Sequence, residues 1–164
     1  MCKLPVLLSI IFLVSCDYLE LDITTDYTEF SLNINPSKPD LHKIDNIVTI
    51  DQIEFEMNYL GVNIEDIKSV SINDAFIKIT NESKEKSFDK YSQMYVVLDN
   101  LDTIAWNYNV QKNSYKVDFE VINKNALTYF EGDTHVFSVY AQLDEQMFDT
   151  LSLNVKLNYK ITIK

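Results

Sequence analysis

The stretch LSLNVKLNYKITI, from Leu151 to Ile163, alternates hydrophobic and polar residues without a break. Its odd-numbered residues are all hydrophobic, and its even-numbered residues are all polar. Because successive side chains of a β-strand project to opposite faces, the pattern predicts a strand with one face against a core and the other in water. Such a strand is typical of an antiparallel sheet.

Similar strand patterns recur along the rest of the chain, and clusters of Asn, Asp and Lys separate them as turns. Only Ile64–Ile67 and Asn125–Phe130 suggest helical turns, and Asp144–Met147 is expected to close a hairpin into the last strand. With the last strand, the total is about eight strands, which predicts an all-β fold, an antiparallel β-sandwich. The other expected strands are Phe30–Ile34, Ile53–Tyr59, Val70–Thr80, Tyr91–Leu98, Thr103–Val110, Tyr115–Val121 and Thr134–Leu143.

The amino terminus has the composition of a secretion signal. Lys3 precedes an apolar run, Leu4–Val14, of 11 residues, about half of the roughly 20 that a helix needs to cross a bilayer. A charged start and a short apolar centre predict a signal peptide over residues 1–15 rather than a permanent transmembrane span.

The end of this run, Leu13-Val14-Ser15-Cys16, resembles the lipobox of bacterial lipoproteins. The resemblance implies that the Cys16 thiol receives a diacylglyceryl group, that a peptidase cuts before it, and that acyl chains anchor the protein to a membrane. Two or more chains give stable anchoring, whereas one is marginal. The alternatives are an ordinary signal peptide with an accidental cysteine and an uncleaved anchor.

The remaining chain divides into an acidic tether over residues 16–26 and a single β-sandwich domain over residues 27–164. Its size is close to the commonest for one domain. Of the 2 cysteines, Cys2 belongs to the signal and Cys16 is consumed by lipid. No disulfide or cysteine-based metal site is therefore expected.

The charge balance disfavours nucleic-acid binding, and no nucleic-acid partner is expected. The chain has 25 acidic residues against 14 basic ones, all of them lysine, with a net charge of −11. Nucleic-acid binding needs a cationic face, and recognition of phosphate favours arginine. Because an acidic surface resists anionic lipid, the acyl chains rather than the protein surface are expected to hold the protein at the membrane.

The sequence indicates only in part which membrane of the bacterial envelope carries the lipid anchor. Asp17 directly after Cys16 resembles the inner-membrane retention signal of enteric bacteria, but other phyla do not use that rule. We expect the outer membrane rather than the inner one, and the periplasmic and surface faces both remain open.

Three segments look like small uncharacterised lipoproteins of Bacteroidota, some of which resemble late-embryogenesis-abundant-type β-sandwiches. The segments are Ile64–Ile72, Ser87–Tyr91 and Leu151–Tyr159. The resemblance implies a fold and a compartment, and it carries no known activity or functional residue.

The sequence offers little catalytic chemistry. With 2 glycines there is no glycine-rich loop for a phosphate or dinucleotide, and His42 and His135 lack metal-ligand spacing and are expected to be plain surface or sheet residues. We expect no catalytic residue, cofactor or metal site, and therefore no enzyme. Two acidic groups could supply oxygen ligands to calcium, although acidic turns are the preferred interpretation: Asp99, Asn100 and Asp102, and Asp144, Glu145 and Asp149.

Aromatic residues are the remaining candidates for a binding site. Trp106 and Tyr108 on one strand face could form a platform for sugar rings. Strict alternation places them with Ile104 and Val110, which favours a position in the core. The sequence therefore predicts a non-enzymatic envelope module that binds a protein or other partner, with a glycan-binding or other small-ligand-binding lipoprotein as the alternative.

Overall fold

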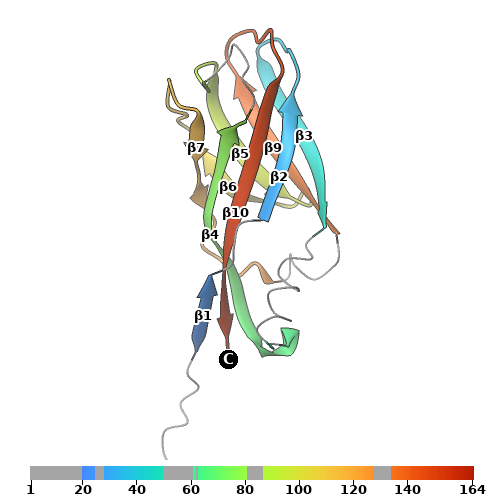
Figure 1. The fold of residues 1–164 in the computed structure, drawn as a ribbon, viewed down its shortest axis with the longest axis vertical. Helices are drawn as coiled ribbons and strands as arrows, with labels where there is room; N and C mark the ends of the chain where they lie inside the picture. Colours follow the sequence, from blue (N-terminus) through green and yellow to red (C-terminus); the bar gives the residue numbers. More distant parts are fainter. Residues whose placement is uncertain (1–19, 25–27, 50–60, 62, 81–86, 128–133) are drawn as a thin grey trace, which may run out of the picture.

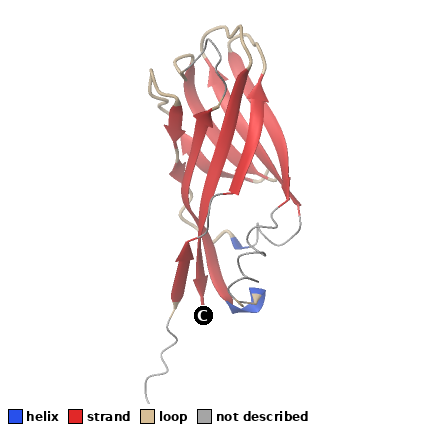
Figure 2. Cartoon of the chain, viewed as in Figure 1, coloured by secondary structure: helices blue, strands red, loops and turns tan. Residues whose placement is uncertain are grey.

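A computed structural model of the chain describes residues 20–24, 28–49, 61, 63–80, 87–127 and 134–164. This part contains ten β-strands in two antiparallel five-stranded sheets (Figure 1, Figure 2). The predicted all-β sandwich is confirmed, with ten strands where about eight were expected. The predicted signal peptide, Cys16 and the strand expected over Ile53–Tyr59 lie outside the described residues.

The first sheet is organised around the carboxy-terminal strand, β10. This strand pairs with β4 along one side and with β2 and β1 along the other, and the short β7 pairs with the outer side of β4. The strands of this sheet are β1 (Leu21–Thr24), β2 (Thr28–Ile34), β4 (Ile67–Ile79), β7 (Lys116–Asp118) and β10 (Leu151–Ile163).

The second sheet has the order β3-β9-β5-β6-β8. Phe119 alone separates β7, which pairs with β4 of the first sheet, from β8, which pairs with β6 at one edge of the second sheet. The strands of this sheet are β3 (Asp40–Thr49), β5 (Tyr91–Leu98), β6 (Asp102–Asn107), β8 (Glu120–Val121) and β9 (Thr134–Leu143).

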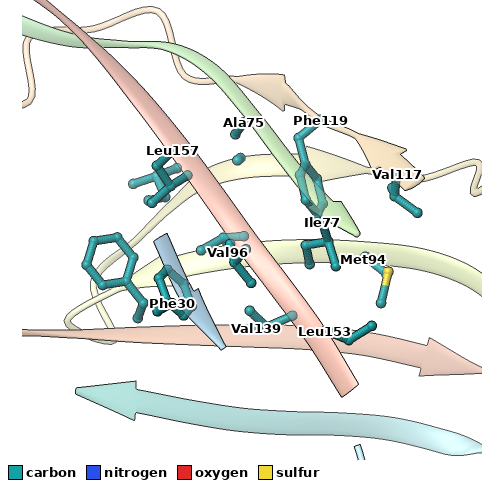
Figure 3. Packing of buried hydrophobic residues seen from close by; sticks show 14 of the residues in the cluster. Phe30, Ala75, Ile77, Met94, Val96, Val117, Phe119, Val139, Leu153 and Leu157 are labelled. Atoms are coloured by element: carbon teal, nitrogen blue, oxygen red, sulfur yellow. The ribbon is translucent and has the colours of Figure 1, made fainter. Parts of the chain in front are cut away.

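The core lies between the two sheets (Figure 3). Every odd-numbered residue of β10 is buried, as the alternation predicted. Leu153 and Leu157 from β10 pack into the same cluster as Met94, Val96 and Val139 from the second sheet. Because these residues project from opposing sheets, burial of their apolar surface holds the two layers together.

The connection between β9 and β10 differs from the expected hairpin. The two strands belong to different sheets, so residues 144–150 cross from one layer to the other. The hairpin prediction is wrong because alternation identifies a strand but not its neighbour. The helical turn expected near Ile64 is present as the 3₁₀ helix η1 (Ile64–Asp66), and the turn expected over Asn125–Phe130 is described only as far as Leu127.

The acidic segment expected to be a tether contains a strand. In β1, Leu21 pairs with Ile163 and Thr24 with Lys160. The Asp22 carboxylate lies 2.7 Å from Lys160 Nζ and accepts a hydrogen bond of 2.8 Å from Thr162 Oγ1. These contacts with Lys160 and Thr162 lower the pKa of Asp22 below its usual value. The folded domain therefore begins within the segment assigned to the tether.

None of the helices in the described ranges has the length and apolar character needed to cross a membrane.

Candidate functional site

A β-bulge decides which side chains of β6 face solvent. Val96 pairs with Ala105, but its neighbour Val97 pairs with Thr103, so Ile104 is an extra residue on β6. A bulge of this kind shifts the alternation of one strand by one position. As a result Ile104 and Ala105 are both fully buried although they are adjacent in sequence.

The bulge places Trp106 on the solvent side of the sheet. Trp106 is half-buried, and its indole Nε1 donates a hydrogen bond of 3.0 Å to Glu120 Oε2 on β8. Tyr108 follows the end of β6 and is 63% exposed. The core position expected for both residues is therefore wrong, because strict alternation did not include the extra residue at Ile104. The strand also ends at Asn107 rather than at Val110.

Trp106 belongs to a row of side chains that crosses all five strands of the second sheet. Register pairs Lys43 with Tyr140, Tyr140 with Tyr95, Tyr95 with Trp106, and Trp106 with Glu120. We call these five residues the aromatic row. Aromatic rings directly opposite one another on a sheet stabilise the strand pairing.

The rings of the aromatic row are held in fixed positions. Tyr95 and Tyr140 stack with centroids 4.8 Å apart and planes 6° apart, and Lys43 Nζ lies 6.0 Å from the centre of the Tyr140 ring. Burial, followed by the neighbouring Tyr140 and Tyr108, raises the pKa of Tyr95. Asn107, the last residue of β6, pairs with Met94, so Tyr108 follows directly after the paired part of β6 and borders the row.

Polar side chains flank the aromatic row on both sides. Gln93 and Gln142 pair with each other, two residues along their strands from Tyr95 and Tyr140. On the other side, Asp45 accepts a hydrogen bond of 2.5 Å from Ser138 Oγ and lies 3.0 Å from Lys43 Nζ. The outer face of the second sheet thus combines aromatic rings with amide, carboxylate and ammonium groups.

The contacts of Asp45 predict a pH dependence of folding stability. The Ser138 hydroxyl, followed by Lys43, lowers the pKa of Asp45 below its ordinary value of 3.8. The charged form is favoured by folding, so its contribution is complete above 3.8 and disappears as the pH falls through the lowered value. We expect Asp45→Asn to be slightly less stable than wild type at pH 7 and equally stable well below pH 3.8, as measured by urea unfolding at both pH values. A stability difference that persists in strong acid would contradict this assignment.

The two acidic groups weighed as calcium ligands form turns and side-chain contacts. Asp99 and Asn100 have positive φ angles of 51° and 57° in the β5–β6 turn, a conformation that Asp and Asn tolerate well. Asn100 Oδ1 accepts a hydrogen bond of 2.8 Å from Lys43, and Asp102 Oδ2 lies 2.9 Å from Lys124 Nζ. In the second group, Asp144 accepts a hydrogen bond of 2.8 Å from Ser92.

The two histidines lie apart on the second sheet. His42 on β3 pairs with Ala141, whereas His135 on β9 pairs with Val48. His135 is buried, and its Nδ1 lies 2.7 Å from Asp99 Oδ2. Asp99 Oδ1 also accepts the Val136 backbone N–H at 2.8 Å, so this carboxylate fastens the β5–β6 turn to the start of β9.

No group of three or more His, Cys, Asp or Glu side chains within the described ranges is arranged to hold a metal ion. No protein-family model matches the sequence, and no curated protein shows significant similarity to it.

Proposed function

We propose that this chain is a lipid-anchored lipoprotein of the bacterial envelope whose β-sandwich is a non-enzymatic binding module. The outer face of the second sheet is the contact surface. The observation that carries the proposal is the aromatic row with Tyr108 at its border, because Trp106 and Tyr108 lie outside the core and Tyr108 is largely exposed.

The arrangement of charged groups favours binding over catalysis. On this face Lys43 contacts Asp45, and Glu120 accepts the Trp106 N–H. These polar groups orient neighbouring side chains and are not assembled as a nucleophile with a positioned base, which acyl or glycosyl transfer would need. Large rings held rigidly are instead well suited to contact a partner, because ordering them on binding costs little conformational entropy.

A photo-crosslinking amino acid at Gln93 would test the contact surface in intact cells. Gln93 adjoins Tyr95 on the outer face of the second sheet, whereas Ser31 is an exposed residue of β2 on the first sheet. We expect irradiation to give a discrete adduct from position 93 and none from the matched control at position 31. Equal adducts from both positions, or none from position 93, would contradict the proposal.

A further inference from the structure

We infer that the ligand of this face is a neutral glycan, whose pyranose ring stacks at Tyr108 and Trp106 and whose hydroxyls bond the flanking polar side chains. This inference rests on the proposed binding function and names the class of its ligand. Three features of the face support a glycan: the aromatic surfaces that other side chains leave open, the polar groups beside them, and the charge of the surface.

The aromatic rings of this face differ in how much of their surface is open. The facing surfaces of Tyr95 and Tyr140 are occupied by their mutual stacking, and Lys43 lies over Tyr140. Tyr108 is 63% exposed, and its neighbour Trp106 is fixed by the hydrogen bond to Glu120. The open aromatic surface of this face therefore lies at Tyr108 and Trp106, where a pyranose ring can stack.

Polar groups beside the open rings match the hydroxyls of a sugar. A pyranose ring presents C–H groups on its faces and hydroxyls around its edge, so it needs an aromatic ring together with planar groups that both donate and accept hydrogen bonds. Gln93 and Gln142 supply amides beside Tyr95, and Glu120 supplies a carboxylate beside Trp106. Amides donate and accept at once, which matches hydroxyl groups.

The charge of this face disfavours anionic sugars. Asp45 and Glu120 are exposed on this face, with Lys43 paired to Asp45, and the whole chain carries a net charge of −11. Carboxylated or sulfated sugars would be repelled by this surface. The glycan is therefore neutral.

The test is a titration of the full chain, purified in a detergent without a sugar head group. The probes are neutral hexasaccharides of β-glucan, α-glucan, xylan and mannan, with oligogalacturonate as the anionic arm. Because Trp106 is the only tryptophan, its fluorescence reports directly on this face, and calorimetry supplies the affinity. We expect at least one neutral hexasaccharide to bind and to shift the emission, and oligogalacturonate to leave it unchanged.

Two matched variants locate the binding. Tyr108→Ala is expected to raise the dissociation constant about tenfold, while Tyr115→Ala removes a tyrosine of similar exposure, 60%, and should have no effect. The inference is overturned if none of the neutral hexasaccharides binds, if the anionic oligomer binds equally well, or if the two variants behave alike. A specific adduct from position 93 without glycan binding would leave the proposed function standing and reject only the glycan.

Discussion

Val155→Asp is expected to destabilise the domain by several kcal/mol, a large part of the ~5–15 kcal/mol that separates folded from unfolded proteins. Val155 is fully buried at the centre of the first sheet, between Phe30 of β2 and Ile77 of β4. A carboxylate at this position would lose its hydration without gaining a partner. Urea unfolding followed by circular dichroism would measure the loss.

The matched control for this prediction is Asn154→Asp, one residue away. Asn154 is on the opposite face of β10, beside Ser31 and Lys78. Register places Lys78 opposite Asn154, and the new carboxylate would lie on the face of β10 away from the core, so we expect a much smaller loss of stability than for Val155→Asp. Equal destabilisation by both variants would show that β10 does not separate a core face from a solvent face.

Cys16→Ser is expected to abolish lipid attachment completely. A serine hydroxyl cannot form the thioether through which the diacylglyceryl group is attached, so the precursor should remain uncut or be released from the membrane. Metabolic labelling with an alkyne fatty acid measures the modification, and membrane fractionation measures the anchoring. Cys2→Ser is the control. Cys2 lies before the expected cleavage site, so this substitution should leave the labelling unchanged.

Equal labelling of wild type and Cys16→Ser would reject the lipoprotein assignment. In that case the binding module would have to reach its partner without an anchor at this position. The outcome is independent of the experiments on the aromatic row, because those measure contacts of the folded domain.

Strand content was predictable because burial of one face imposes alternation. The β10 pattern could be read directly, since each odd-numbered residue faces the core. The neighbour of each strand was not predictable in the same way: the 144–150 connection crosses between sheets, and Leu21–Thr24 pairs with the far end of the chain. Pairing depends on contacts between residues distant in sequence, which a local pattern does not encode.

The outer face of the second sheet was only partly predictable for a different reason. Trp106 and Tyr108 were recognised as candidates, but the bulge at Ile104 reversed the side to which they were assigned. Tyr95 and Tyr140 were missed, although each alternates with buried neighbours and could have been placed on an outer face from sequence. What connects them to Trp106 is the strand register, and only the three-dimensional arrangement supplies it.

The pairing of β1 with the end of β10 determines how the domain would respond to mechanical load. Figure 1 shows β1 alongside the last residues of β10, at the end of the molecule away from the β9–β10 connection. If the chain is held through Cys16, tension enters at Leu21 and acts along the strand axis. The hydrogen bonds between β1 and β10, together with the ion pair of Asp22 and Lys160, then share the force in shear instead of opening one after another. Under tension the sandwich would be held through β10, the strand whose odd-numbered residues are all buried in the core.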